Sequence, residues 1–258
     1  MNILLEIRKI KQKEISIAKR KASLVVLKAR AAKLKRKIRP FAKVLSKKDK
    51  MHLIAEIKPK SPSAGRLIKT TPLNVARLYG KSRADAISVL TDKKFFGGNL
   101  KLLSSVKKIV KQPVLRKDFI LDEYQVYESF LGEADAILLI TSFLSQTLLK
   151  RLYEISTKLG LGCLVEIHNK ADLKKALSID AEIIGINNRN LKTMRTDLRT
   201  TENLIKLIPK GSTIVSESGI ESKSDVLRMK KIRVNAVLVG TSILRSSNPI
   251  KHINSLKV

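Results

Sequence analysis

The sequence predicts a closed (β/α)8 barrel, the TIM-barrel class of α/β fold, preceded by an N-terminal helical extension. From residue 52 onward, short apolar runs alternate with longer amphipathic stretches, and eight such runs occur. Each run is rich in β-branched residues or leucine and is almost continuously apolar, which is typical of strands buried on both faces of a parallel sheet. Eight strand–helix units in about 200 residues match the count of a closed barrel.

The main alternative fold is a doubly wound open sheet. Such a sheet usually carries fewer strands and a glycine-rich first turn. No G-x-G-x-x-G follows any of the apolar runs, and the chain also lacks a P-loop, an H-E-x-x-H and a C-x-x-C motif. We therefore expect one domain over residues 1–258, with 1–48 as the helical extension and 52–258 as the barrel.

Residues 1–48 carry a helical pattern. Apolar residues recur at helical spacing and predict at least one helix packed against the barrel. These residues are Ile15, Ala18, Ala22, Val25 and Ala29. Pro40 is expected to end the helical pattern, and Phe41 and Leu45 are expected to pack onto the barrel. The Lys and Arg side chains of this segment are most simply a solvated face.

The barrel elements follow in order along the chain. The predicted strands are 52–58, 86–91, 113–118, 136–141, 163–168, 182–187, 213–218 and 236–241. The predicted helices lie near 72–81, 99–110, 123–132, 145–159, 170–178, 200–207, 222–231 and 248–255. Asn99 and Ser145 suit helix N-caps, because short polar side chains accept hydrogen bonds from the first turn. Gly132 and Gly160 suit helix C-terminal ends.

The composition excludes several classes of protein. No uncharged apolar stretch of about 18 residues is present, which excludes a membrane-spanning helix. No secretory signal is visible at the N-terminus. The single cysteine, Cys163, cannot form an internal disulfide, so we expect a reducing, cytoplasmic location. The chain has 3 histidines, too few to predict a histidine-rich metal site.

The formal net charge of +31 raises the question of nucleic-acid binding. About half of this excess lies in the first 50 residues, where 18 Lys and Arg stand against Glu6, Glu14 and Asp49. Aromatic residues are few and are not interleaved with this charge, so the stacking platform of a single-strand binder is missing. We favour a general lysine-rich bias. The alternative, a nucleic-acid-binding protein, predicts tight and steeply salt-dependent binding to DNA or RNA.

Polar and ionisable residues stand at the ends of most predicted strands, where barrels of this class place their reacting groups. They are Glu56, Lys58, Arg116, Lys117, Asp118, Glu166, His168, Asn187, Asn188, Arg189, Glu217, Ser218, Gly219, Gly240 and Thr241. Barrel closure should bring two lysines and two carboxylates together at one mouth: Lys58, Lys117, Glu56 and Glu166. Such groups push each other's pKa values apart, which suits general acid–base chemistry. The alternative is a structural ion-pair network inside the barrel. We disfavour it because four ionisable groups stand at corresponding strand ends.

Small residues after the last two strands suggest a phosphate site. Ser218-Gly219 and Gly240-Thr241 occupy the positions where barrel loops often bind phosphate through backbone N–H groups. Ser61 and Ser63, after the first strand, are expected to close the same site. The alternative for each glycine is a tight βα turn, and both interpretations hold together because such a turn builds the anion nest.

Long motifs run through most of the chain, from about residue 40 to residue 250. They are IAEIKPKSPSAG, LTDKKFFGG, PVLRKDFILDEYQV, ADAILLI, GLGCLVEIHN, IIGINNRNLKT, VSESGI and AVLVGTSILR. In these motifs and their order the chain resembles the indole-3-glycerol phosphate synthases of tryptophan biosynthesis. The resemblance implies a carboxy-lyase that closes the pyrrole ring of 1-(2-carboxyphenylamino)-1-deoxyribulose 5-phosphate with loss of CO2 and water. It implies no metal or organic cofactor, a small phosphorylated partner, and no membrane; a monomer is compatible with it, and the oligomeric state stays open.

The resemblance also implies roles for individual residues. Lys117 matches the family's proposed general acid, and a lysine with a lowered pKa can protonate the ketone oxygen. Lys58 matches the residue that binds the substrate carboxylate, with proton donation at dehydration as an open alternative. Glu166 matches a catalytic carboxylate, and Glu56 and Asn187 match its supporting polar groups.

The remaining matches concern substrate binding. Arg189 is expected to contact the anionic substrate. Glu217 and Ser218 are expected to line the rim, and Ser218 is also expected to take part in catalysis. The phosphate cradle is expected to comprise Ser61, Gly219, Gly240 and Thr241. Phe96 and Phe119 are expected to wall the anthranilate ring, with plain core packing as the alternative. Another sugar-phosphate isomerase or aldolase barrel would share the phosphate site without needing both lysines and Glu166.

Overall fold

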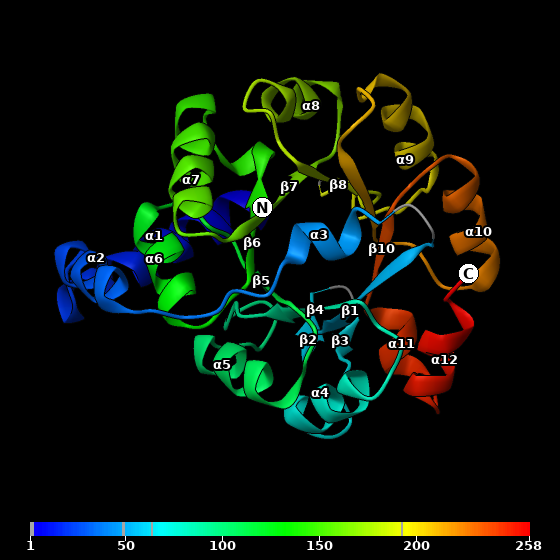
Figure 1. Cartoon of the computed structure of the whole chain (residues 1–258), viewed down its shortest axis with the longest axis horizontal. Helices are drawn as coiled ribbons and strands as arrows, with labels where there is room; N and C mark the ends of the chain where they lie inside the picture. Colours follow the sequence, from blue (N-terminus) through cyan, green and yellow to red (C-terminus); the bar gives the residue numbers. More distant parts are fainter. Residues whose placement is uncertain (1–2, 48–49, 63, 192) are drawn as a thin grey trace.

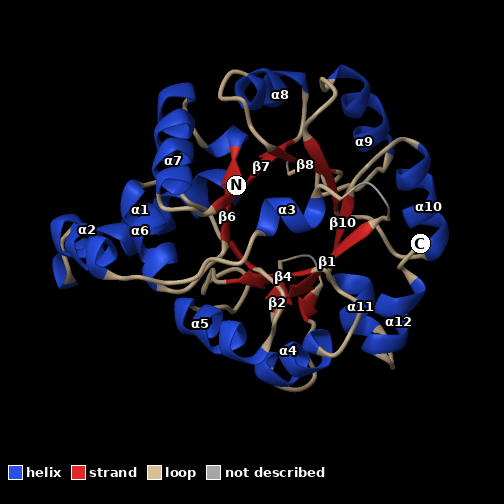
Figure 2. Ribbon diagram, in the orientation of Figure 1, coloured by secondary structure: helices blue, strands red, loops and turns tan. Residues whose placement is uncertain are grey.

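Eight parallel strands close into a barrel surrounded by helices (Figures 1 and 2). The computed structural model describes residues 3–47, 50–62, 64–191 and 193–258. The strands pair in the order β1-β10-β9-β8-β7-β6-β5-β4, with β4 closing on β1. They are β1 (His52–Ile57), β4 (Ala86–Leu90), β5 (Val114–Lys117), β6 (Ala136–Ile140), β7 (Gly162–Ile167), β8 (Ile183–Asn187), β9 (Thr213–Glu217) and β10 (Ala236–Val239). The predicted fold class is confirmed.

Helices follow the strands on the outside of the barrel. They are α4 (Pro72–Gly80), α5 (Leu100–Ile109), α6 (Glu123–Leu131), α7 (Gln146–Lys158), α8 (Lys170–Leu177), α9 (Arg199–Leu204), α10 (Lys223–Lys231), α11 (Thr241–Arg245) and α12 (Pro249–Ser255), with 3-10 turns η1 (Thr141–Phe143) and η2 (Ile205–Leu207). The predicted N-caps are confirmed, because Asn99 and Ser145 accept hydrogen bonds from the first turns of α5 and α7. Gly132 caps α6, and Gly160 follows α7 in a left-handed conformation at φ +77°.

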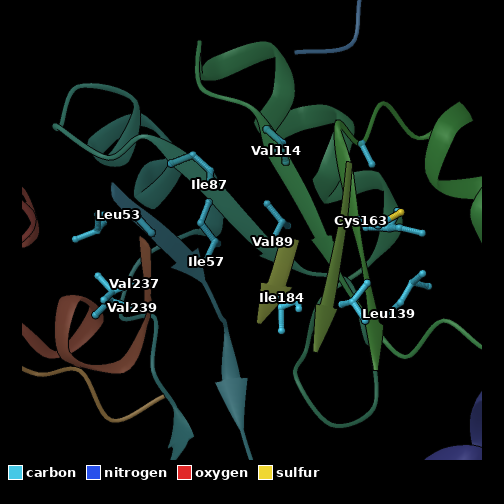
Figure 3. Close-up of a cluster of buried hydrophobic side chains, with 14 of the residues drawn as sticks. Leu53, Ile57, Ile87, Val89, Val114, Leu139, Cys163, Ile184, Val237 and Val239 are labelled. Carbon is cyan, nitrogen blue, oxygen red and sulfur yellow. The ribbon is translucent and has the colours of Figure 1, made fainter. Parts of the chain in front are cut away.

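The strands divide their side chains between two apolar layers, because successive residues point to opposite faces. Outward side chains such as Leu53, Val89 and Leu139 pack with the helices (Figure 3). Inward side chains such as Ile54 and Leu164 fill the barrel interior. Every residue of the barrel strands is buried except the first residue of β7 and the last residue of β5. This two-sided burial explains the almost continuous apolar runs of the sequence.

The extension contains three helices before β1: α1 (Ile3–Lys21), α2 (Leu24–Lys33) and α3 (Phe41–Leu45). Phe41 and Leu45 are buried as predicted, against interior residues of the barrel strands. The Cβ of Phe41 lies 3.3 Å from the position a side chain would take at Gly162, the first residue of β7. The short helix α3 therefore closes the N-terminal end of the barrel, and it lies over the barrel centre in Figure 2.

The predicted helix in the extension is confirmed, but two other expectations were wrong. The helical pattern is divided between two helices, because α1 ends at Lys21 and Ser23 caps a new helix by accepting from the Val26 N–H. Val25 is consequently rotated outward and is 74% exposed, and Ala29 is exposed as well. Pro40 ends no helix: α2 stops at Lys33, and Pro40 instead stands immediately before α3, where a missing N–H costs nothing.

Two short features were not predicted. Strands β2 (Lys60–Ser61) and β3 (Gly65–Arg66) form a small antiparallel hairpin directly after β1, and α11 begins directly after β10. Pieces of two to five residues are too short to show a period. Within the described ranges, no helix combines the length and the apolar character needed to cross a membrane.

Candidate active site

The barrel interior changes from apolar to ionisable along its strands. Four interior apolar residues are Ile54, Leu115, Leu164 and Val215. The residues two positions later on the same strands are Glu56, Lys117, Glu166 and Glu217. Since side chains alternate with a period of two, these four share the inward face and lie one layer nearer the C-terminal end. The strands thus present a layer of charge directly above an apolar floor.

A cavity of about 450 Å³ opens above this layer at the C-terminal end of the barrel. Of the residues to which a catalytic or binding role was assigned, all except Glu217 line it: they are Glu56, Lys58, Ser61, Phe96, Lys117, Phe119, Glu166, Asn187, Arg189, Ser218, Gly219, Gly240 and Thr241. Of the other strand-end candidates, Asp118 lines the cavity, whereas Arg116, His168 and Asn188 do not. Ser63 lies outside the described residues. The cavity is also lined by Leu4 and Ile7 of α1 and by Leu191, Met194 and Thr196 of the loop after β8, none of which was predicted as a site residue.

Lys117, at the end of β5, lies among three carboxylates. Its Nζ is 2.6 Å from Glu217 Oε2 and 3.5 Å from Glu56 Oε1, and the side chain is largely buried. Burial alone would lower the pKa of Lys117, but the carboxylates of Glu217, Glu56 and Glu166 outweigh it and raise the pKa above the ordinary value. The expectation of a lowered lysine pKa is therefore wrong, because a third carboxylate joins the two that were expected.

Glu56 links the two lysines. Its Oε2 lies 2.5 Å from Lys58 Nζ, and its Oε1 faces Lys117. Burial alone would raise the pKa of Glu56, but the two ammonium groups outweigh it and hold the pKa below the ordinary value. Lys58 and Lys117 are both largely buried, and both line the cavity.

Glu217 occupies a different place from the predicted rim position. It is fully buried at the end of β9 and bonds to Lys117 from below the cavity. Gly185 on the neighbouring strand β8 makes room for it, because a Cβ there would collide with the Glu217 carboxylate. Burial raises the pKa of Glu217 to about 7, since the nearby Glu166 and Glu56 carboxylates offset much of the attraction of Lys117. This side chain is thus poised to exchange a proton near neutral pH.

Glu166 is held by a histidine to which the sequence assigned no role. His168 Nε2 lies 3.2 Å from Glu166 Oε1, and its Nδ1 lies 3.5 Å from Asp172 Oδ2 in the first turn of α8. Burial alone would lower the pKa of His168, but the two carboxylates outweigh it and raise the pKa to about 10. The pKa of Glu166 is lowered despite burial, through His168, Lys117 and the Asn187 amide. The only signal for His168 in the sequence was its position at the end of the predicted strand 163–168, directly before the N-cap Asn169.

Two glycine-containing turns form one wall of the cavity. Ser218 and Gly219 both adopt left-handed conformations, at φ 66° and 83°, and a Cβ on Gly219 would lie 2.7 Å from Thr196 Cγ2. Gly240 packs directly against the Glu56 carboxylate. Thr241 is the first residue of α11, whose opening N–H groups have no partner within the helix. These turns place backbone donors beside the cavity, as an anion nest requires.

Aromatic side chains and Arg189 complete the lining. The rings of Phe96 and Phe119 have centroids 6.2 Å apart at an angle of 39°. The Arg189 guanidinium donates to the Met194 carbonyl oxygen at 3.2 Å, which steadies it at the cavity wall. Over the described ranges, no cluster of three or more His, Cys, Asp or Glu side chains is arranged to hold a metal ion.

A family model described as "Indole-3-glycerol phosphate synthase" matches residues 4–256. The chain belongs to the indole-3-glycerol phosphate synthase family. Members of this family are carboxy-lyases of tryptophan biosynthesis that act on a phosphorylated small molecule. The resemblance predicted from the sequence motifs is thereby confirmed, and the match includes the N-terminal extension.

Curated indole-3-glycerol phosphate synthases are similar to this chain over most of its length. The protein of Thermoanaerobacter sp. (strain X514) is 48% identical over 216 residues, covering 83% of this chain and 82% of the relative. The protein of Clostridium kluyveri (strain NBRC 12016) is 42% identical over 253 residues, covering 97% and 96%.

Solved structures of other barrels share the fold. The 3-hexulose-6-phosphate synthase of Salmonella typhimurium superposes with a TM-score of 0.64 at 14% identity, covering 80% of this chain and 96% of that chain. Thiamine phosphate pyrophosphorylase from Pyrococcus furiosus gives 0.59 at 15% identity, covering 80% and 93%. At these identities the likeness shows the fold alone, whereas the indole-3-glycerol phosphate synthase family is shown by sequence.

Proposed function

We propose that the cavity closes the pyrrole ring of 1-(2-carboxyphenylamino)-1-deoxyribulose 5-phosphate by lysine–glutamate general acid–base catalysis. The observation that carries this proposal is the position of Lys117 Nζ, buried among carboxylates at the floor of the cavity. Its raised pKa keeps this lysine protonated at neutral pH. Ring closure needs such a group, because the ketone oxygen must gain a proton as carbon attacks the carbonyl.

Three bond changes follow in order. The anthranilate ring carbon that bears the carboxylate attacks the ketone carbon, and the ketone oxygen takes the proton of Lys117 and becomes a hydroxyl. The carboxylate then leaves as CO2, and its bonding electron pair returns to the ring. Finally the hydroxyl leaves as water with one added proton while a base removes the proton from the adjacent carbon, which forms the indole double bond.

Glu166 is the proposed base of the last step. It lies at the end of β7, inside the cavity and two strands away from Lys117 of β5 in the ring of strands. His168 holds it ionised and oriented. Glu217 is the proposed proton reservoir of Lys117, because its carboxyl contacts the ammonium and has a pKa near neutrality. Lys58 is placed to bind the carboxylate before it leaves or to protonate the departing hydroxyl, and both assignments remain open.

The anionic and aromatic ends of the substrate are assigned to separate walls. We assign the phosphate to the turns at Gly219 and Gly240, with Ser218, Thr241 and Ser61 adding hydroxyl groups. We assign the anthranilate ring to Phe96 and Phe119, and Arg189 to the anionic groups between the two ends. Fixing both ends holds the reacting carbons together, which supplies much of the rate enhancement in intramolecular closures.

The direct test is to mix the pure protein with the substrate and record indole fluorescence. The wild-type protein should form indole-3-glycerol phosphate, and a protein that forms none would refute the proposal. Glu166→Gln should lower kcat by roughly 10²–10⁴, the range for a lost acid–base group. Glu202→Gln is the matched control, because Glu202 pairs with Arg228 on the surface and should leave kcat unchanged. Normal turnover in Glu166→Gln would remove Glu166 from the mechanism.

A further inference from the structure

One lysine of the basic N-terminal extension is buried. Lys11 of α1 is only 3% exposed, whereas its neighbours Lys9 and Lys13 on the same helix are exposed. The expectation that the Lys and Arg side chains of this segment form a solvated face is therefore wrong for Lys11. A buried ammonium group needs charged partners to offset its desolvation.

Three carboxylates supply that compensation. Lys11 Nζ lies 2.9 Å from Asp92 Oδ2, 2.9 Å from Asp118 Oδ1 and 2.8 Å from Glu14 Oε2. Burial alone would lower the pKa of Lys11, but the carboxylates outweigh it and raise the pKa above its ordinary value. Asp92 follows β4 and Asp118 follows β5, so a single ammonium group joins the extension to two neighbouring strand ends.

Both aspartates also hold backbone that lines the cavity. Asp92 Oδ1 accepts hydrogen bonds from the N–H groups of Phe95 at 2.7 Å and Phe96 at 3.2 Å. Asp118 Oδ1 accepts from the Phe119 N–H at 2.8 Å, and Asp118 directly follows Lys117 in the chain. The same two carboxylates that hold Lys11 therefore fix the proposed aromatic walls and the segment that carries the proposed acid.

We propose that Lys11 is a positioning residue for the ring-closing reaction: through Asp92 and Asp118 it sets the loop of Phe96 and the end of β5 that carries Lys117. This inference rests on the roles proposed above for those cavity residues. The extension would then support the active site through Lys11, in addition to lining the cavity with Leu4 and Ile7.

Contacts other than those of Lys11 also hold α1 on the barrel. An effect of Lys11 on the cavity can therefore be distinguished from loss of α1 packing. Lys19, further along the same helix, pairs with Asp122 at 2.7 Å, and the Tyr124 hydroxyl donates to the Ala18 carbonyl oxygen at 3.1 Å. Neither Lys19 nor Asp122 lines the cavity above the charged layer. Lys19 is thus a matched control, with the same residue type, helix and kind of partner.

The experiment compares Lys11→Met, Lys11→Arg and Lys19→Met by steady-state kinetics and by hydrogen exchange. Lys11→Met should lower kcat/KM by about 10²-fold, the scale of a small misplacement of reacting groups. Lys11→Arg, which keeps the charge, should recover most of that loss. Lys19→Met should stay within about threefold of the wild type, because a partly exposed pair contributes little. The amides of Phe95 and Phe96 should exchange faster in Lys11→Met only.

Each alternative result has a distinct meaning. Unchanged kcat/KM and unchanged exchange at Phe95 in Lys11→Met would overturn the positioning role, as would an equal loss in Lys19→Met. If Lys11→Met does not fold, Asp92→Asn decides, since Lys11 keeps Asp118 and Glu14: we expect faster exchange at Phe95 and about a tenfold loss of kcat/KM, and no change in either overturns the proposal. Failure of the wild-type protein to make indole would refute the proposed function, whereas the exchange measurement would still test Lys11.

Discussion

The two ends of the barrel each hold a buried lysine–carboxylate pair, and the two pairs have opposite electrostatic surroundings. At the N-terminal end, Lys107 of α5 pairs with Asp135, which precedes β6. At the C-terminal end, Lys117 of β5 pairs with Glu217 of β9. The pKa of Lys107 is lowered, because burial and the nearby Arg39 and Arg36 outweigh Asp135. The pKa of Lys117 is raised despite burial, because three carboxylates surround it.

The carboxylate at each end shows what the difference means. Asp135 is fully used, since it also accepts the backbone N–H groups of Arg39 at 2.7 Å and Val114 at 2.8 Å. Through Arg39, Asp135 joins the extension to the barrel. Neither Lys107 nor Asp135 lines the 450 Å³ cavity. Glu217 instead holds a pKa near 7 beneath an open cavity. Ion pairs of the same type therefore have different surroundings at the two ends, and we propose proton transfer only for the pair beneath the cavity.

Of the variants that compare the two ends of the barrel, Lys117→Ala should have the largest effect on kcat. We expect kcat to fall by roughly 10²–10⁴, because the proposed proton donor is removed. Lys107→Met is the matched variant at the other end and should leave kcat of the folded protein unchanged. Steady-state turnover by indole fluorescence checks both variants. Equal losses of kcat in the two variants would erase the functional distinction between the ends.

The reverse test measures stability at the N-terminal end. Lys107→Met should lower the free energy of unfolding by about 3 kcal/mol, because it leaves the Asp135 charge buried with one fewer partner. Denaturant titration checks this value. Lys150→Met is the control, since Lys150 lies on the surface at 4.0 Å from Glu154 and should change the free energy by at most a few tenths of a kcal/mol. A loss no larger than in this control would contradict the structural role of the pair.

A third variant tests whether the cavity end binds the phosphate where proposed. Thr241→Asp should raise KM by about tenfold, because a new carboxylate would repel the phosphate at short range. Thr71→Asp is the control: Thr71 is the exposed N-cap of α4, and aspartate caps helices as well as threonine does. An unchanged KM in Thr241→Asp would move the phosphate to another wall.

The last prediction concerns the pH dependence of stability. Because the pKa of Glu217 is raised from 4.5 to about 7, the folded state holds this proton more tightly than the unfolded state. Its contribution to stability is complete below about pH 4.5 and is lost as pH rises to about 7, by at most about 1.4 kcal/mol per pH unit. Glu217→Gln should lack this decline, so its stability relative to the wild type should increase over that window. If the free energies of unfolding of the two proteins change with pH by the same amount between pH 4.5 and 7, the raised pKa is contradicted.

The barrel was predictable from the sequence because its physics is local. Two-sided burial produces an apolar run at each strand, and short polar caps such as Asn99 mark the helix starts. The break between α1 and α2 was not predictable, because apolar spacing continues across Ser23 and only the cap changes the direction of the chain. The hairpin of β2 and β3 is too short to leave a pattern.

The sequence predicted which residues form the candidate site better than it predicted which of them contact one another. Strand ends identify Lys117 and Glu166 as neighbours once the barrel closes, since closure fixes which ends meet. Which carboxylate contacts Lys117 depends on the space left by Gly185, 32 residues before Glu217 and on another strand. Lys11 gave no signal, because a lysine on an amphipathic basic helix is ordinarily solvated and its burial depends on partners far along the chain.

The most direct test of the central claim is a crystal structure with indole-3-glycerol phosphate bound. We expect the indole ring beside Phe96 and Phe119, and Lys117 Nζ within about 3 Å of the ligand or of a water bound to it. The phosphate should lie at the turns containing Gly219 and Gly240. A ligand bound at the C-terminal end with its phosphate away from these turns, or with Lys117 turned from it, would contradict the account.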